Sequence, residues 1–258
     1  MIGIHVLKST GSTNKVAYEL ALQGEAQGTV VMAESQSNGR GRLGKVWVSP
    51  PGKGLYCSII VRPDLSVEDY PKITLTAGLA VALALEEVSG LEMQLKWPND
   101  VYSAGKKCCG ILTESSPLID GSTDRFAIVG IGININSEFA DFPQELHDKV
   151  TSLRILTGSN LDIQTVLHRV RSSLLEQIAV FELKGFGAIL KEWRKRDMLY
   201  GRLLQWVSTS GEIIVGRSEG PDKDGRLMVQ GEDGKTHQIL SGDINLADTV
   251  RNGEAALK

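Results

Sequence analysis

The run Val129-Gly130-Ile131-Gly132-Ile133-Asn134-Ile135-Asn136 alternates glycine with isoleucine and then asparagine with isoleucine. A period of two residues predicts a β-strand, because successive side chains of a strand point to opposite faces of its sheet. Two glycines weaken a strand unless another group must come close to its backbone. The run therefore predicts a strand with one face open to close approach, and it places Asn134 on the same face as Gly130 and Gly132.

The segments around this run supply the rest of a sheet and its helices. β-branched and apolar stretches predict strands at 3–7, 29–33, 55–61, 93–97, 108–114 and 126–135. Apolar residues at helical spacing predict helices at 15–22, 71–89, 162–183 and 186–198. Residues 98–105 are expected to form a turn between two of the strands. Because strands and helices do not alternate strictly, the predicted fold class is α+β with a mixed sheet.

The sequence pattern changes after Tyr200-Gly201. Short strands are predicted at 203–207, 213–217, 227–230 and 237–240, separated by turn-forming residues. Turn signals at this spacing are typical of a small β-barrel of roughly 45 residues. The chain has 258 residues, and at about 150 residues per domain this allows one large and one small domain. We therefore expect a large domain over 1–200 and a barrel over 201–258.

Composition excludes several classes of protein. Hydrophobic residues make up 41% and charged residues 23% of the chain, which is an ordinary globular balance. The net charge of −3 gives no basic field for nucleic acid, and no apolar run is long enough to predict a membrane span. The absence of a signal-peptide pattern and the sparse Cys57, Cys108 and Cys109 predict a cytoplasmic protein without a disulfide framework.

The glycine-rich stretch Gly39-Arg40-Gly41-Arg42-Leu43-Gly44-Lys45-Val46 fits three nucleotide-binding motifs incompletely. A dinucleotide site needs a helix after it, and Val46 to Pro51 cannot start one. A P-loop needs a hydroxyl where Val46 stands, and the kinase motif needs catalytic sequences that do not follow. Glycines with three nearby cations suit a phosphate, although a solvated basic hairpin accounts for them equally well.

Further chemistry-bearing residues come before and after the next predicted turn. Lys96-Trp97-Pro98-Asn99-Asp100 ends one strand, and Lys107 precedes the next. Asp100 is either a magnesium ligand beside phosphates or part of a solvated Asn-Asp turn. Lys107 is either aimed at a ligand or extended along the surface with its charge in water.

Taken in order, these motifs resemble the biotin protein ligases, and the resemblance spans about residues 5–250. The matching elements are Ser12-Thr13-Asn14, Gln36 with Gly39 to Trp47, Lys96 to Asp100, Lys107 with Gly110-Ile111-Leu112, and Gly130 to Asn134. The resemblance implies a class II synthetase-like mixed sheet with helices packed on one side, followed by an SH3-like barrel. Both agree with the secondary structure predicted above.

The resemblance also implies an activity. Biotin and ATP, with Mg²⁺, would form biotinyl-5′-AMP and release pyrophosphate, and the biotinyl group would then pass to a lysine of a biotin carboxyl carrier protein. The family often forms homodimers through the large sheet. The Ser12-Thr13-Asn14 motif lies close to the start of the chain, so we expect a ligase without the DNA-binding domain and repressor activity that some members have.

Residue roles follow by the same resemblance. The ureido end of biotin is assigned to Ser12, Thr13 and Asn14, with Gln36 beside them, since a buried ureido group needs both donors and acceptors. The loop Gly39-Arg40-Gly41-Arg42 would close over biotin and the adenylate. Arg42 and Lys107 are the catalytic candidates, because cations there would stabilise charge at the α-phosphate. Both are also assigned to biotin, with Lys107 near its carboxylate.

The nucleotide is assigned to a second group of residues. Trp47 would offer a flat face to adenine, or it is simply a core aromatic residue. The remaining ATP-binding candidates are Arg40, Arg42, Lys96, Asn99, Asp100 and Asn134, with Asp100 also a candidate magnesium ligand. Trp193 to Asp197 forms a basic turn that either reaches the nucleotide or is a solvated helix end.

Three other functions compete with this interpretation. A lipoate ligase shares the chemistry, but Gly39 to Trp47 does not match the loop of that family. A non-catalytic biotin-binding or regulatory module would not need the phosphate-directed cations Arg40, Arg42 and Lys107. A nucleotide-dependent nucleic-acid protein would need a basic stripe with interleaved aromatic residues, which the sequence lacks.

Overall fold

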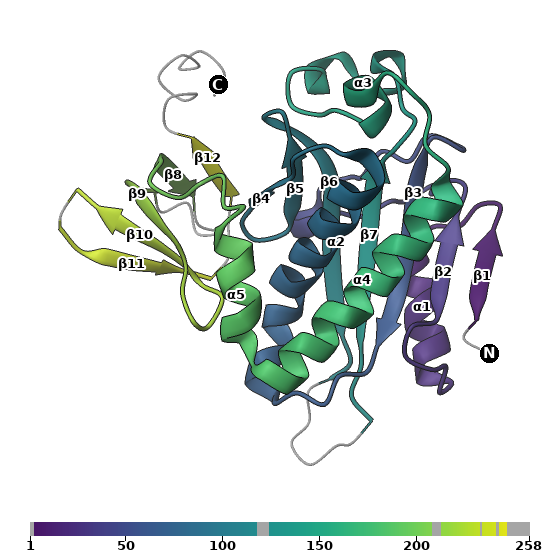
Figure 1. Cartoon of the computed structure of the whole chain (residues 1–258), viewed down its shortest axis with the longest axis horizontal. Helices are drawn as coiled ribbons and strands as arrows, with labels where there is room; N and C mark the ends of the chain where they lie inside the picture. The colour runs from purple at the N-terminus through teal and green to yellow at the C-terminus, as the bar shows by residue number, and fades with distance from the viewer. Residues whose placement is uncertain (1–2, 118–123, 208–212, 233, 241–242, 247–258) are drawn as a thin grey trace.

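The structure is a computed structural model that describes residues 3–117, 124–207, 213–232, 234–240 and 243–246. Within them, a seven-stranded mixed sheet carries helices and is followed by a five-stranded antiparallel sheet (Figure 1). The small sheet lies beside the last helix, at the end of the large sheet opposite its first strand (Figure 1). The expected α+β class with a mixed sheet is confirmed.

The large sheet has the strand order β1-β2-β3-β7-β6-β5-β4. Its strands are β1 (Ile4–Leu7), β2 (Val30–Ala33), β3 (Gly54–Val61), β4 (Gln94–Lys96), β5 (Asp100–Ser103), β6 (Lys106–Ser115) and β7 (Ala127–Asn134). Strands β1 and β2 are parallel, and the other neighbours are antiparallel. The glycine-isoleucine strand β7 lies at the centre, where Gly132 pairs with Tyr56 on one side and Gly110 on the other.

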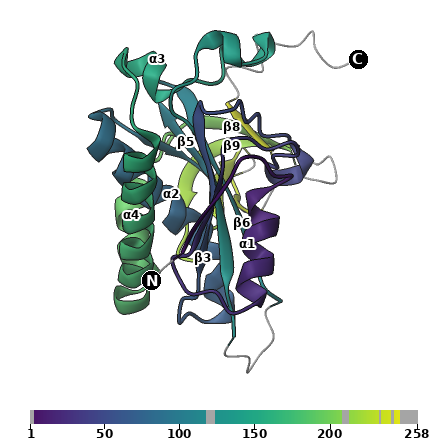
Figure 2. The same ribbon diagram turned by 90° about the vertical axis from the view of Figure 1, so that its right-hand side faces the viewer.

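Helices cover both faces of the large sheet (Figure 2). They are α1 (Thr13–Leu22), α2 (Ile73–Ser89), α3 (Leu153–Thr157), α4 (Ile163–Lys184) and α5 (Phe186–Arg194), with 3-10 turns at Arg42–Gly44, Val67–Lys72, Phe139–Asp141 and Gln144–Leu146. Helices α2 and α4 pack on one face and α1 packs on the other (Figure 2).

The prediction of helices on one side only is wrong for α1. Ala17 and Ala21 of this helix form a second apolar cluster with Val31 and Ile60 of the sheet. The physical reason lies in β3, which is buried at every position from Gly54 to Val61. A strand buried on both faces needs a covering layer on each, and the parallel β1-α1-β2 connection brings α1 across the face that α2 and α4 leave open.

The expected turn over 98–105 is also partly wrong, because it contains strand β5. This strand pairs with β6 through a short hairpin whose turn residues, Ala104 and Gly105, have φ values of 49° and 75°. Positive φ at both positions matches the twist of a two-residue hairpin. Asp100, expected in a loop, is therefore held at the start of a strand, with Asn99 just before it.

The small sheet has the order β11-β10-β9-β8-β12. Its strands are β8 (Leu203–Val207), β9 (Ile213–Pro221), β10 (Leu227–Gly231), β11 (Thr236–Ile239) and β12 (Asp243–Leu246), the last of which the sequence analysis missed. An antiparallel sheet of this size is consistent with a small barrel. It is attached to the large sheet at Trp97, whose indole N–H donates to the carbonyl of Gly225 over 2.9 Å.

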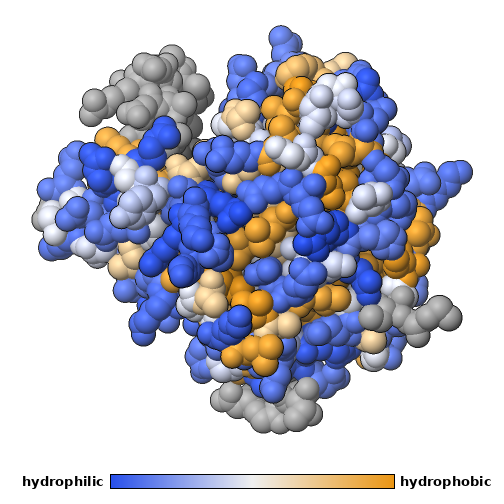
Figure 3. Space-filling model, in the orientation of Figure 1, coloured by the Kyte–Doolittle hydropathy of each residue, from blue (hydrophilic) through white to orange (hydrophobic). Residues whose placement is uncertain are grey.

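The face that carries α2 and α4 shows hydrophobic residues in strips between hydrophilic ones (Figure 3). None of the helices over the described residues has the length and apolar character needed to cross a membrane.

Candidate functional site

A cavity of about 380 Å³ opens on the face of the large sheet that carries α1. Its wall comes from the start of α1, the hairpin 39–47, the segment 96–100, strands β6 and β7, and the segment 142–150. Ile244 of the small sheet completes the wall. The site residues expected from sequence all line this cavity except Gly39.

Three strand glycines form the floor of this cavity. A Cβ atom on Gly130 would lie 2.1 Å from Oδ1 of Asn14, and one on Gly132 would lie 2.5 Å from the indole of Trp47. A Cβ on Gly110 would be 2.8 Å from the same indole. These distances are well inside van der Waals contact. The predicted close approach to the glycine face therefore exists. The groups that approach it include two side chains of the protein itself, Asn14 and Trp47.

The N-terminus of α1 forms the uncharged polar end of the cavity. Ser12 precedes the helix, but its side chain makes no capping hydrogen bond. Gln36 takes that role, because its Oε1 accepts from the backbone N–H of Thr13 over 3.0 Å. The hydroxyl of Ser58 lies 2.7 Å from Oγ1 of Thr13 and 2.6 Å from Oδ1 of Asn14. The Ser-Thr-Asn motif thus borders a cavity as well as starting a helix.

The glycine-rich stretch forms a tight hairpin over the cavity. Gly41 N–H donates to the carbonyl of Lys45 over 2.7 Å, and Trp47 N–H donates to that of Gly39 over 2.9 Å. Gly39 closes this hairpin, since a Cβ there would meet the Trp47 carbonyl at 2.4 Å. Side chains then tie the hairpin to the sheet, with Arg42 donating to Oδ1 of Asn99 over 3.4 Å.

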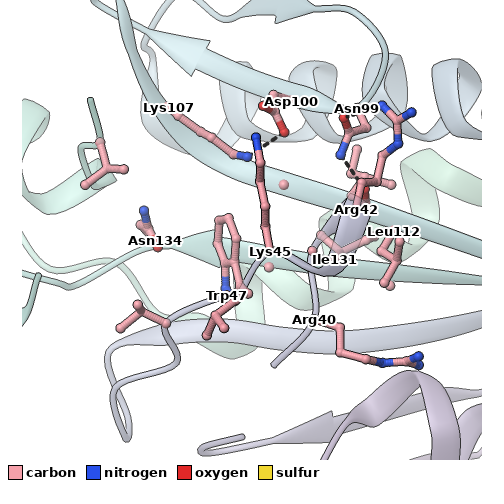
Figure 4. Close-up of a pocket in the computed structure, with 18 of the residues that line it drawn as sticks. Arg40, Arg42, Lys45, Trp47, Asn99, Asp100, Lys107, Leu112, Ile131 and Asn134 are labelled. Atoms are coloured by element: carbon pink, nitrogen blue, oxygen red, sulfur yellow. Dashed lines mark hydrogen bonds and ion pairs between the residues drawn. The ribbon is translucent and has the colours of Figure 1, made fainter. Parts of the chain in front are cut away.

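Positive charge gathers at the other end of the cavity. Nζ of Lys107 lies 2.6 Å from Oδ1 of Asp100 and 5.4 Å from the centre of the Trp47 ring. Lys45 points from the hairpin toward the same Lys107–Asp100 pair (Figure 4). Lys45 was recognisable from sequence as one of three cations in the glycine-rich stretch, but it was not among the expected site residues. Closely spaced cations that face a cavity are suited to a phosphate or carboxylate.

The donor set does not fit a resident magnesium ion. Asp100 is the carboxylate expected to hold the metal, and it is already paired with Lys107. Among the residues that the structure describes, no three His, Cys, Asp or Glu side chains come together as a metal site. A hard divalent cation needs about six oxygen ligands.

The amides expected to bind nucleotide are held by backbone carbonyls. Asn99 donates to the carbonyl of Ile111 over 2.8 Å, and Asn134 donates to that of Thr151 over 3.0 Å. Lys96 also lines the cavity, with Nζ 5.8 Å from the centre of the Tyr102 ring. Desolvation raises the pKa of Tyr102 above its ordinary value, which keeps its hydroxyl neutral.

The segment 142–150 is the part of the site that sequence reasoning missed. Phe142, Leu146, Lys149 and Val150 line the cavity. Their position depends on β6, because the backbone N–H of Lys107 donates to the carbonyl of Lys149 over 2.9 Å. No periodicity or motif in this segment signals such a contact.

The basic turn Trp193 to Asp197 lies away from the cavity. Arg194 donates to the carbonyl of Pro221, and Arg196 pairs with Glu86 over 2.7 Å. The turn therefore holds the small sheet and α2 in place. None of the residues Trp193 to Asp197 lines the cavity, so the described structure does not support the interpretation that this turn contacts a ligand there.

Comparison with known proteins decides the family. A model described as the biotin/lipoate A/B protein ligase family matches residues 6–134, and one described as the biotin protein ligase C terminal domain matches residues 207–246. The "Bifunctional ligase/repressor BirA" of Bacillus subtilis is 37% identical over 235 residues, which cover 91% of this chain and 71% of that protein. This chain belongs to the biotin/lipoate A/B protein ligase family.

Further relatives support membership of this ligase family. The "Biotin--[acetyl-CoA-carboxylase] ligase" of Mycobacterium tuberculosis is 30% identical, with 93% of this chain and 88% of that protein covered. The biotin protein ligase of Aquifex aeolicus, solved in complex with biotin and ATP, superimposes with a TM-score of 0.79 and 32% identity, covering 95% of this chain and 99% of that one. The chain is accordingly a ligase.

Proposed function

We propose that this ligase activates biotin with ATP and transfers it to a lysine of a biotin carboxyl carrier protein. The observation that carries the proposal is the division of one cavity into two chemically different ends. Uncharged donors and acceptors from Ser12, Thr13, Asn14 and Gln36 stand at one end. Lys107 and Lys45 of the hairpin stand at the other. Biotin has a neutral ureido group and a carboxylate that match these two ends.

In the first step, a carboxylate oxygen of biotin attacks the α-phosphorus of ATP. An O–P bond forms, the bond to the β-phosphate oxygen breaks, and pyrophosphate leaves. Lys107 and Arg42 would stabilise the negative charge that develops on the phosphate oxygens. Lys107 is paired with Asp100 before substrate arrives, so this carboxylate holds the ammonium group in place for the phosphate. No side chain is needed as a covalent nucleophile.

In the second step, the neutral amine of an acceptor lysine attacks the carbonyl carbon of the adenylate. The new C–N bond replaces the C–O bond to phosphate, AMP leaves, and the amine loses its proton. Trp47 would stack on adenine, while Lys96, Asn99, Asp100 and Asn134 would contact the nucleotide. The hairpin residues Gly39 to Arg42 would cover the adenylate and exclude water.

The proposal has several finer parts. Magnesium would enter with ATP, bound mainly by phosphate oxygens, because the protein offers only the paired Asp100 in the described cavity. Residues 1–200 would form the catalytic domain and 201–258 an SH3-like barrel, and two copies would pair through the large sheet. A net charge of −3 favours ligation without DNA binding or repression. Three cysteines that are all free support a reducing cytoplasm.

Biotin-dependent exchange of labelled pyrophosphate into ATP tests the proposal. The wild-type protein should catalyse exchange with biotin, and lipoate and octanoate run in parallel should give none. Lys107→Ala should lower the exchange rate by about 100-fold or more, since it removes a preorganised charge at the reacting phosphate. Lys195→Ala, which removes a lysine paired with Glu192 on the surface, should leave the rate unchanged.

Each other outcome has a definite meaning. Exchange with lipoate instead of biotin would mean that the acid is wrong and the adenylation chemistry is right. Folded protein that binds biotin without exchange would be a sensor, and the proposal of an enzyme acting on biotin would be wrong.

A further inference from the structure

One carboxylate oxygen joins the hairpin to the polar end of the cavity. Oε2 of Glu114 accepts from Nη2 of Arg40 over 3.0 Å and from Nδ2 of Asn14 over 2.6 Å. Arg40 belongs to the hairpin, Asn14 to the start of α1, and Glu114 to β6 between them. Glu114 is not among the residues that line the cavity. It therefore acts on the site through its two partners.

The Asn14 side of this arrangement is fully determined. Nδ2 of Asn14 also donates to the carbonyl of Leu112 over 3.1 Å, and Oδ1 accepts from the hydroxyl of Ser58 over 2.6 Å. The amide is buried against Gly130. With both amide hydrogens and the oxygen engaged, Asn14 has one orientation. Glu114 supplies the only charged group among these partners, and hydrogen bonds to charged groups are the stronger ones.

The Arg40 side is more exposed and more easily broken. The Arg40 and Glu114 side chains are 43% and 36% exposed, and an ion pair at this exposure contributes little while water surrounds it. The hairpin itself is closed by its own backbone bonds between Gly41 and Lys45 and between Trp47 and Gly39. Because the hairpin is internally bonded, holding Arg40 also holds Arg42 and Trp47 over the cavity.

We propose that Glu114 is a positioning residue that couples the seating of substrate beside Asn14 to closure of the hairpin 39–47. Its carboxylate is anchored by Asn14 on the buried side and captures Arg40 on the exposed side. A ligand that fills the cavity removes water from the Arg40–Glu114 pair and so strengthens it. The coupling of this pair to substrate rests on the proposed function, whereas the pair itself is present without ligand.

Trypsin provides a direct readout, because it cleaves after Arg40, Arg42 and Lys45 of the hairpin. In full-length protein without ligand, Glu114→Gln should raise the initial rate of cleavage at these bonds about two- to fivefold, since the neutral amide loses the charge of an exposed ion pair with Arg40. The matched control is Glu87→Gln. It neutralises a carboxylate that accepts a 2.6 Å hydrogen bond from Arg169, and this pair lies outside the site. This variant should be cleaved at the wild-type rate.

Exchange kinetics separate positioning from loss of folding. Glu114→Gln should raise the KM for biotin about tenfold while kcat falls less than threefold, and Glu114→Asp should recover part of the change. Arg40→Gln combined with Glu114→Gln should be no worse than the poorer single variant, because both remove the same pair. A merely structural role would lower kcat and the melting temperature and leave KM unchanged.

The two proposals fail separately. If the rate of hairpin cleavage and the KM for biotin of Glu114→Gln both stay within twofold of wild type, the positioning role is wrong. Exchange by the wild-type protein would still support the ligase. Absence of exchange in wild type would overturn the proposed function. In that case equal ligand-free cleavage of wild type and Glu114→Gln would also overturn the Arg40–Glu114 contact, and faster cleavage of the variant would support it.

Discussion

Substituting Gly132 by alanine tests the contact between the central strand and the hairpin. A Cβ at this position would lie 2.5 Å from Cε2 and Nε1 of Trp47. Non-bonded carbon atoms pack at about 3.5–4.0 Å, so the indole must move by about 1–1.5 Å. Trp47 is half-buried and belongs to a surface hairpin. The hairpin can therefore shift while β7, fixed between β3 and β6, stays in place.

We expect Gly132→Ala to lower activity more than stability. A misplacement of about 1 Å in an active site can lower catalysis by about 100-fold, so we expect kcat/KM for biotin-dependent exchange to fall by about 10- to 100-fold. The free energy of unfolding should change by less than about 1 kcal/mol, because the hairpin relieves the overlap and the core is not overpacked. Urea unfolding followed by circular dichroism measures the second quantity.

Two further variants make the result specific. In a Trp47→Ala background, Gly132→Ala should cost nothing more, since the atoms that it would overlap are gone. Gly187→Ala is the matched control, because a Cβ there meets nothing within 4 Å. If Gly132→Ala keeps wild-type exchange kinetics, or adds its full loss on top of Trp47→Ala, then Trp47 does not rest on Gly132 in the working enzyme.

The remaining predictions concern buried titratable groups. Burial raises the pKa of Asp197 to about 6, so between pH 4 and 6 the folded state binds more protons than the unfolded state. The contribution of Asp197 to the free energy of unfolding should then fall as pH rises through this range, by about 3 kcal/mol from about two pH units at 1.36 kcal/mol each. Asp197→Asn should flatten that slope in urea titrations, and an unchanged slope would assign it to other groups. Burial also raises the pKa of Cys57 and Cys108 to about 12. Both should react with a thiol reagent at pH 8 only as fast as the protein unfolds, and rapid labelling of folded protein would contradict their burial.

Much of the fold follows from local patterns. The two-residue period of 129–136 identified β7, and the apolar spacing of 71–89 identified α2, because both elements are long and strongly periodic. The strand β5 was missed, since Trp97-Pro98-Asn99-Asp100 has the composition of a turn and its pairing with β6 is a non-local fact. The side of the sheet chosen by α1 was missed for a similar reason, because amphipathic spacing shows that a helix has an apolar face without showing which layer covers it.

For the site, the sequence by itself determined the chemical types: glycines that admit close approach, cations for phosphate, and uncharged donors and acceptors. Their short motifs are contiguous in the chain, so each could be recognised alone. The tertiary structure decided which side chains meet. It paired Lys107 with Asp100, laid Trp47 on Gly132, brought Phe142 to Val150 into the wall, and set Glu114 between Arg40 and Asn14. These contacts join residues that are distant in the chain, and only the register of β6 and β7 with their neighbours brings such residues together.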